Sequence, residues 1–174
     1  MSTLITPHTK TEKRLLIWCA LLVFFSVILD QGSKLAIQAI LPLHGAIEVI
    51  PGWFNIYYVR NTGAAWSMLS GYPWLLLGFG VAAGIFILCF FRRWSEGFPE
   101  RYCALALIEG GIIGNSIDRL WYGSVIDFLH VHCYDVYHYP VFNIADCAIC
   151  IGVGIFILSN LLRKQKKENS DPGK

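Results

Sequence analysis

Four long apolar stretches divide the chain, at residues 15–29, 73–91, 102–117 and 148–162. A helix that crosses a bilayer needs about 20 predominantly apolar residues. Three of the stretches are slightly shorter, and each can lengthen into its flanks, as at residues 31–40 after the first. Runs such as Leu-Leu-Val-Phe-Phe-Ser-Val-Ile-Leu offer no polar face to water. The pattern therefore predicts four transmembrane helices and argues against a soluble protein with buried helices.

The first apolar stretch also has the basic flank of a secretory signal peptide, in Lys10, Lys13 and Arg14. A signal peptide ends at small residues suited to cleavage. This stretch is followed instead by Asp-Gln-Gly-Ser-Lys at residues 30–34. We therefore expect residues 15–29 to be retained as the first membrane span.

The composition also indicates a membrane protein. Of the 174 residues, 55% are hydrophobic and only 15% are charged, and the mean hydropathy is +0.52. A soluble domain carries about 25% charged residues, so the composition excludes a disordered chain, a nucleic-acid-binding tail and an ordinary cytosolic enzyme. Most of the six cysteines fall inside predicted spans or at their ends. They indicate small apolar fillers and no disulfide framework.

The basic residues predict the orientation of the spans. Eleven of the fourteen Lys and Arg residues precede the first stretch, separate the second from the third, or follow the fourth. Cytoplasmic loops carry such an excess. We therefore expect both termini in the cytoplasm and two outer segments, at about 31–72 and 118–147. Residues 48–50 and 54–59 have the composition of short strands, which predicts a small sheet on the outer leaflet.

Five acidic residues lie at the ends of predicted spans or inside them: Asp30, Glu109, Asp118, Asp127 and Asp146. Acidic groups in such places are costly and usually mark function. Four of the five lie at predicted outer ends, so they should converge on one membrane surface. Glu109 alone lies in the middle of a span.

Spacing and capping signals surround these acids. Small residues recur every four positions from Ala106 to Asp118, a spacing that puts them on one helix face and permits close packing of a neighbouring helix. Asn143 is suited to cap the fourth helix, which would put Asp146 near the positive end of the helix dipole. Helix packing and capping alone would account for many of these residues. Spacing and capping signals therefore leave open whether the residues serve structure or function.

Five motifs in a fixed order connect these positions. They are Asp30-Gln31-x-x-Lys34, Asn61-x-Gly63-Ala64-Ala65-Trp66-Ser67, Gly111-x-x-Gly114-Asn115-x-x-Asp118-Arg119, Gly123-x-Val125-x-Asp127-Phe128 and Phe142-Asn143-x-Ala145-Asp146. Together they resemble the motifs of bacterial lipoprotein signal peptidase (signal peptidase II). The family often has Phe at the position of Trp66. The resemblance covers about residues 15–162.

This resemblance implies an aspartic endopeptidase of the bacterial inner membrane, with its active site near the periplasmic face. Its substrate would be a prolipoprotein whose cysteine carries a diacylglyceryl group, cut just before that cysteine. The implied fold is an all-α polytopic membrane protein with four transmembrane helices, a small extracytoplasmic β-cradle and a periplasmic loop or short helix. The whole chain, residues 1–174, would form one membrane-embedded domain. We expect a monomer that contacts membrane lipid, binds no nucleic acid and needs no cofactor or metal.

Carried over motif by motif, Asp127 and Asp146 would be the catalytic pair. Positions matching residues that support or line the site are Asp30, Lys34, Asn61, Gly111, Asn115, Arg119 and Asn143. Two close carboxylates share one proton, so one can take a proton from water while the other stabilises the scissile carbonyl. The helix dipole favours charge on Asp146, so we expect Asp127 to hold the proton, unless Arg119 lies nearer to Asp127.

Other functions fit parts of the sequence. His130, His132 and Cys133, with His138 nearby, are residue types that bind zinc, but no H-E-x-x-H motif accompanies them. The two histidines alternate at strand-like spacing, and we expect them in a polar or interfacial loop. Membrane acids also mark a proton- or cation-coupled transporter, although these acids gather at one face and no inverted repeat is visible. A purely structural membrane protein is the remaining alternative.

Overall fold

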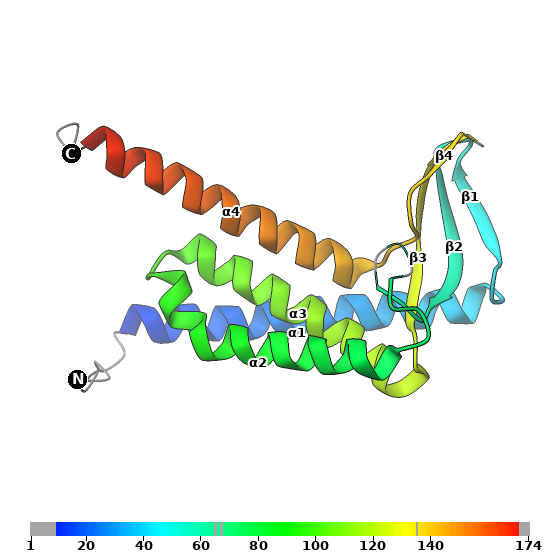
Figure 1. Cartoon of the computed structure of the whole chain (residues 1–174), viewed down its shortest axis with the longest axis horizontal. Coiled ribbons are helices and arrows are strands. Elements are labelled where there is room, and N and C mark those ends of the chain that lie inside the picture. The colour runs from blue at the N-terminus through cyan, green and yellow to red at the C-terminus, as the bar shows by residue number, and fades with distance from the viewer. Residues whose placement is uncertain (1–9, 65, 67, 135, 171–174) are drawn as a thin grey trace.

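A computed structural model describes residues 10–64, 66, 68–134 and 136–170. Ala65 and Ser67 of the second motif lie outside the described residues. The described elements, in chain order, are α1 (Lys10–Ile40), β1 (Ala46–Ile50), β2 (Phe54–Asn61), α2 (Pro73–Ser95), α3 (Pro99–Tyr122), β3 (Val125–Cys133), β4 (Tyr137–His138) and α4 (Ile144–Ser170). The helices run along the long axis of the molecule and the strands stand at one end of it (Figure 1). The start of α1 and the end of α4 lie at the opposite end.

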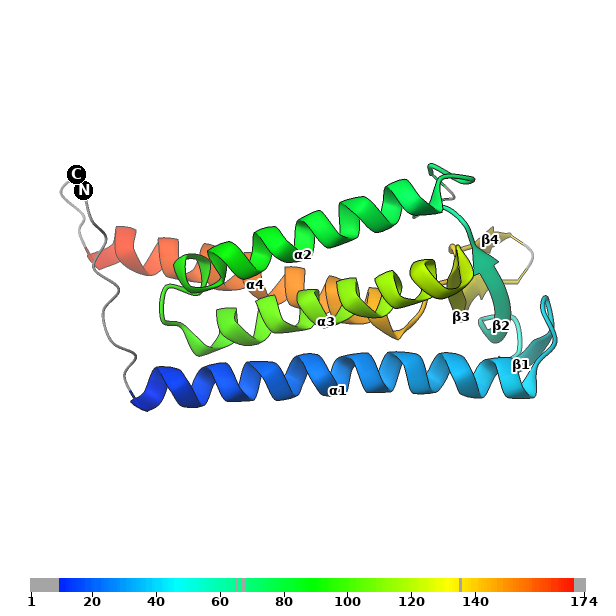
Figure 2. The ribbon, with the colours of Figure 1, turned by 90° about the horizontal axis from the view of Figure 1, so that it is seen from below.

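Three of the described helices, α1, α2 and α4, are long and apolar enough to cross a membrane. The third predicted span, α3, is more polar, because it contains Glu109, Asn115 and Asp118 among its buried residues. It packs against each of the other three helices, and Figure 2 shows it lying between α1 and α2. The structure is thus a helical membrane-type fold in which α3, with buried polar residues along its length, is packed among the other helices.

Local sequence signals explain where the helices α2 and α3 begin and end. Both start with a proline in the first turn, Pro73 and Pro99, where the missing N–H costs nothing. α3 ends at Gly123, which has a φ of 65° and donates its backbone N–H to the carbonyl of Arg119. A left-handed glycine cap of this kind stops a helix abruptly. The chain can therefore turn from α3 straight into β3, which carries Asp127.

The first helix extends well beyond its apolar stretch. α1 has 31 residues and runs through residues 31–40, as the sequence allowed. Its buried side chains include Asp30 and Lys34, whereas large apolar residues such as Phe25 and Leu29 are exposed. The outer third of α1 therefore turns a polar face toward the bundle and an apolar face outward.

The strands form one antiparallel sheet in the order β1-β2-β3-β4. The first two strands confirm the prediction for residues 48–50 and 54–59. β3 and β4 were not predicted, because the sequence around His130 and His132 was interpreted as an interfacial loop. In the β2–β3 register, Val59 pairs with Asp127 and Asn61 pairs with Val125. Asn61 and Asp127 are therefore diagonal neighbours on adjacent strands, a relationship that lets side chains meet.

Candidate active site

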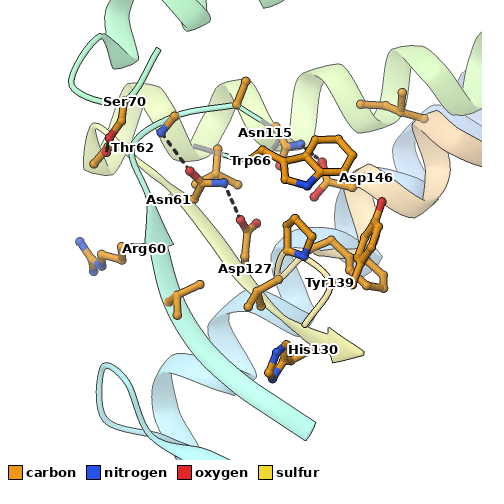
Figure 3. A pocket seen from close by; sticks show the side chains of 18 of the residues that line it. Arg60, Asn61, Thr62, Trp66, Ser70, Asn115, Asp127, His130, Tyr139 and Asp146 are labelled. Carbon is orange, nitrogen blue, oxygen red and sulfur yellow. Dashed lines mark hydrogen bonds between the residues drawn. The ribbon is translucent and has the colours of Figure 1, made fainter. Parts of the chain in front are cut away.

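A cavity of about 830 Å³ lies where the sheet meets the ends of α3 and α4. Its wall is contributed by β2 and the loop that follows, by α3, by β3, by residues 138–142 and by the first turns of α4. Figure 3 shows Asn61, Asp127, Asn115 and Asp146 facing this space from different elements. The predicted site residues that line the cavity are Asn61, Asn115, Arg119, Asp127 and Asp146.

Asp127 lies on β3 and is only 2% exposed. Both of its carboxyl oxygens accept hydrogen bonds from neutral amides: Oδ1 from Asn143 at 2.7 Å and Oδ2 from Asn61 at 3.0 Å. Burial, and next the nearby charge of Asp146, raise the pKa of Asp127 to about 7, although the two amide hydrogen bonds act to lower it. The carboxyl of Asp127 therefore keeps its proton to a higher pH than an ordinary aspartate does.

Asp146 lies in the first turn of α4, where the positive end of the helix dipole favours a negative charge. Its backbone N–H donates to Oδ1 of Asn143 at 2.9 Å, and its own Oδ2 accepts the backbone N–H of Asn143 at 3.1 Å. This reciprocal pair confirms the predicted capping role of Asn143. Oδ1 of Asp146 accepts a third bond, from the side-chain amide of Asn115 at 2.8 Å.

Asn143 lies behind the cavity wall and is fully buried. Besides its bond to Asp127, its side-chain NH₂ donates to Oδ1 of Asn115 at 3.0 Å and to the carbonyl of Ile126 at 3.3 Å. The residue that caps α4 at Asp146 is thus also the residue that fixes Asp127 on β3. It joins the two carboxyls without adding charge.

A buried ion triad supports the site from α1. The ammonium of Lys34 lies 2.8 Å from Oδ2 of Asp30 and 2.8 Å from Oδ2 of Asp118, and none of the three side chains is more than 1% exposed. Lys34 also donates to Oδ1 of Asn115 at 3.1 Å. Because an ammonium can only donate, it fixes the oxygen of the Asn115 amide toward Lys34 and the NH₂ toward Asp146.

Asp30 and Asp118 each tie a further element to this triad. Oδ1 of Asp30 accepts the backbone N–H of Ala145 at 2.9 Å, at the start of α4. Oδ2 of Asp118 accepts the backbone N–H of Ile126 at 3.0 Å, next to Asp127 on β3. Asp30 and Lys34 therefore act by positioning the elements that carry the two cavity carboxyls.

Gln31 contacts the same buried polar group as Lys34. No role was predicted for it from the sequence, although it belongs to the first motif. Its side-chain NH₂ donates to Oδ1 of Asp118 at 2.9 Å, to Oδ2 of Asp30 at 3.1 Å and to the carbonyl of Gly114 at 3.1 Å. The signal that could have identified it is its place beside Asp30 within an otherwise apolar helix.

Arg119 contacts backbone carbonyls. Its guanidinium donates to the carbonyl of Asn115 at 3.3 Å and to that of Gly63 at 3.4 Å. The N–H of Gly63 in turn donates to Oδ1 of Asn61 at 2.9 Å. Arg119 therefore fastens the loop after β2 to α3 and so holds Asn61 against Asp127.

Gly111 serves the site through packing and does not line the cavity. A Cβ at this position would collide with the backbone oxygen of Ala145 and would lie 2.6 Å from Cγ1 of Ile149. The absent side chain therefore lets α3 and α4 approach closely.

The residues proposed as alternative zinc ligands lie at the sheet. His130 and His132 are on β3 and His138 is on β4, with ring centroids 5.0–5.6 Å apart. Within the part of the chain that the structure describes, no three His, Cys, Asp or Glu residues are arranged to hold a metal ion. The three imidazoles are therefore packed against one another in the arrangement seen here.

Comparison with known proteins places this geometry in a family. Residues 22–162 match the sequence model of signal peptidase (SPase) II. The chain is 43% identical over 150 residues to the lipoprotein signal peptidase of Syntrophotalea carbinolica, a match that covers 84% of this chain and 90% of the relative. It is 43% identical over 145 residues to that of Ralstonia nicotianae, covering 80% of this chain and 82% of the relative.

Solved structures agree with the sequence relatives. A bacterial membrane enzyme determined by the in meso method at 2.3 Å resolution superposes with a TM-score of 0.77 at 34% identity, over 88% of this chain and 90% of that one. A second bacterial membrane enzyme, determined at 1.9 Å, superposes with a TM-score of 0.73, also at 34% identity, over 82% of this chain and 92% of that one. With the family match over most of its length, this chain belongs to the signal peptidase II family.

Proposed function

We propose that this protein removes the signal peptide from diacylglyceryl-modified prolipoproteins, and that Asp127 and Asp146 are its catalytic pair. One observation carries the assignment of the pair. Two carboxyls from separate elements line one cavity, and the oxygens of both are held by neutral amides of Asn61, Asn115 and Asn143. Membership of an aspartic peptidase family that processes prolipoproteins supports the reaction.

The two carboxyls divide the acid and base roles. Asp146, charged at its helix N-terminus, takes a proton from the attacking water, while Asp127 gives its proton to the oxygen of the scissile carbonyl. The tetrahedral intermediate then collapses: Asp146 passes its proton to the leaving nitrogen, and Asp127 recovers one from the intermediate's hydroxyl. One water is consumed, and the new amino terminus belongs to the lipidated cysteine.

The amides suit this proton sharing because they are neutral. An Asn side chain offers both a donor and an acceptor, so it can orient a carboxyl in either protonation state. A cation in direct contact with Asp127 would favour its ionised form. Asp127 would then lack the proton that the reaction needs. The ammonium of Lys34 acts to lower the pKa of Asp127 from nearby, but it is paired directly with Asp30 and Asp118.

The apolar part of the substrate would remain in contact with the bundle and with membrane lipid. Exposed apolar side chains cover the outer faces of α1, α2 and α4, and the α4 part of the cavity wall includes Ile149 and Cys150. Burial of each methylene of the diacylglyceryl group contributes about 0.8 kcal/mol. The acyl chains therefore supply binding energy that an unlipidated precursor lacks.

We further propose that α3 crosses the membrane with the other three helices and that residues 1–174 act as one monomeric domain. Both termini would then lie in the cytoplasm and the cavity at the periplasmic face, in keeping with the basic residues at one end of the bundle.

Arg93→Cys and Val136→Cys in a cysteine-free background test this arrangement. An impermeant maleimide should label position 136 in intact spheroplasts and position 93 only after lysis. Labelling of both positions from one side would refute it.

The catalytic assignment is tested with Asp127→Asn and Asp146→Asn, which keep the shape of each side chain but remove its ionisable carboxyl. Either change should abolish cleavage of a lipidated precursor peptide, and the double variant should be scarcely worse, because groups that act as a unit are not additive. Glu109→Gln on α3, which removes a buried carboxyl away from the cavity lining, is the matched control and should retain activity. Near wild-type cleavage by either aspartate variant would contradict the assignment.

The same assay separates the other classes of function. A transporter or a purely structural protein would cleave neither a lipidated precursor nor its unlipidated counterpart. A zinc peptidase would lose activity with a chelator and regain it with zinc. The proposed aspartic peptidase should cleave the lipidated peptide alone and should be insensitive to chelation.

A further inference from the structure

The cavity continues past the two carboxyls to a group of imidazoles on the sheet. His130 of β3 and His138 of β4 both line it. His130 is three residues beyond Asp127 on the same strand, a separation of about 10 Å. Figure 3 shows His130 on the sheet side of Asp127, away from Asp146. The cavity therefore has a second polar end that the proposed reaction does not use.

His130 and His138 stack with the buried His132, and we name the three rings the histidine cluster. Nδ1 of His138 and Nε2 of His130 are 3.3 Å apart and share one hydrogen bond. All three rings stack with interplanar angles of 22° or less. Nδ1 of His132 is paired with the carbonyl of Tyr134 at 3.2 Å, while its Nε2 is buried with no partner among the described residues. The cluster thus keeps hydrogen-bonding capacity that the fold leaves unused.

The described groups around the cluster include a ring from β2 and the residues of the cavity wall. From β2, the ring of Tyr57 lies 5.8 Å from His130, and its hydroxyl contacts His44 at 3.5 Å. Among the described residues of the cavity wall, Asp127 and Asp146 are the only carboxyls. The sheet end of the cavity therefore presents imidazole nitrogens, which can donate hydrogen bonds to an anionic group.

The geometry of the reaction determines which part of a substrate would reach this end. The signal peptide is apolar and stays with the helices, so the residues that follow the cut must leave toward the sheet. An extended chain advances about 3.3 Å per residue. A span of about 10 Å from Asp127 therefore brings the second to fourth residues of the mature segment past His130 and His138.

We propose that the histidine cluster is a binding subsite for an acidic side chain in the second to fourth residue of the mature segment. This inference rests on the proposed function and adds a preference among its substrates. A carboxylate there would accept N–H donors from His130 and His138, and hydrogen bonds to a charged group are stronger than neutral ones. A lysine at the same place would meet no counter-charge.

The preference should depend on pH. Burial, and next the neighbouring His132 and His138, lower the pKa of His130, so its ring is neutral at neutral pH. A bound carboxylate favours the protonated imidazole, and this form becomes easier to reach as the pH falls. The advantage of an acidic residue is therefore larger at pH 6 than at pH 8.

Competing lipidated peptides test the subsite. The purified full-length protein is given peptides that differ only in carrying Glu, Gln or Lys at residue two, three or four after the cut. At one or more of these positions, kcat/KM for Glu should exceed that for Gln by about threefold to tenfold at pH 6, with a smaller ratio at pH 8 and with Lys poorest. Equal values for Glu and Gln at all three positions would overturn the subsite.

Variants assign any preference to the cluster. The ratio of Glu to Gln turnover should fall to about one in His130→Asn/His138→Asn, and should fall in part in His138→Asn, which alters an exposed side chain alone. His44→Asn changes an exposed histidine of the same outer region that does not line the cavity, and it should keep the wild-type ratio. An unchanged ratio in His138→Asn would overturn the subsite. If the wild type cleaves none of the lipidated peptides, the proposed function itself fails.

Discussion

The side-chain amide of Asn143 donates a 2.7 Å hydrogen bond to Oδ1 of Asp127. The same residue caps the helix that carries Asp146. One buried amide thus sets the position of both carboxyls relative to each other, although they come from a strand and a helix. The geometry of the pair therefore depends on a residue that lies outside the cavity lining.

Asn143→Ala should therefore lower kcat far more than it raises KM. The change removes the cap of α4, worth about 1 kcal/mol, and the donor that holds Asp127. We expect a fall in kcat of about 10²-fold, the size of effect produced by loss of one oriented donor in other active sites. Steady-state kinetics on a lipidated peptide measures it. Asn160→Ala, also on α4, removes an exposed amide bonded to the carbonyl of Phe156 and should have no effect. A normal kcat in Asn143→Ala would refute the role.

The pH dependence of kcat/KM should show an alkaline limb near pH 7. The pKa of Asp127 is raised to about 7 by burial and by Asp146, so Asp127 is protonated below this pH and loses its proton above it. Because the reaction needs that proton, the rate falls as the pH rises through about 7. A pH–rate profile from pH 5 to pH 9 tests this limb, and a flat profile between pH 6 and pH 8.5 would contradict it.

Asn61→Ala tests whether the alkaline limb belongs to Asp127. The amide of Asn61 lowers the pKa of Asp127 by donating to its carboxylate, so its removal should move the alkaline limb to higher pH. Asn55→Ala, on the same strand but outside the cavity lining, should leave the limb in place.

Lys34→Met should destabilise the protein strongly. The change leaves Asp30 and Asp118 buried without their counter-ion, and removal of one partner from a buried ion group costs about 3–5 kcal/mol. The apparent melting temperature in detergent should fall accordingly. Lys13→Met, at an exposed position of the same helix, should change stability by less than about 0.5 kcal/mol. Equal melting temperatures for the two variants would show that the triad contributes nothing.

The parts of the fold that depend on local sequence could be predicted. Apolar length located the helices, and the spacing of Asn143 and Asp146 predicted the cap, because both signals act within a few residues. β3 could not be predicted in this way. Its partner strand β2 lies more than sixty residues earlier in the chain, and the alternating His130 and His132 fit a surface loop equally well.

The sequence also could not predict which residues of the candidate site line the cavity and which are buried behind its lining. The motifs contain Lys34 and Asn115 without any sign that one is buried behind the other. Their contact joins α1 to α3 across 81 residues, so it arises only from the packing of whole helices. Arg119 illustrates the same limit, because its carbonyl partners belong to backbone that only the folded loop presents.

The position of α4 after β3 in the chain has a consequence for biosynthesis. Asp146 follows nearly everything else the cavity needs, and α4 is fastened by the bond from the N–H of Ala145 to Asp30 of the first helix. A nascent chain that has reached β3 carries Asp127 but neither its partner carboxyl nor the amide of Asn143. If Asp127 and Asp146 are the proposed catalytic pair, the nascent chain therefore stays inactive until α4 docks.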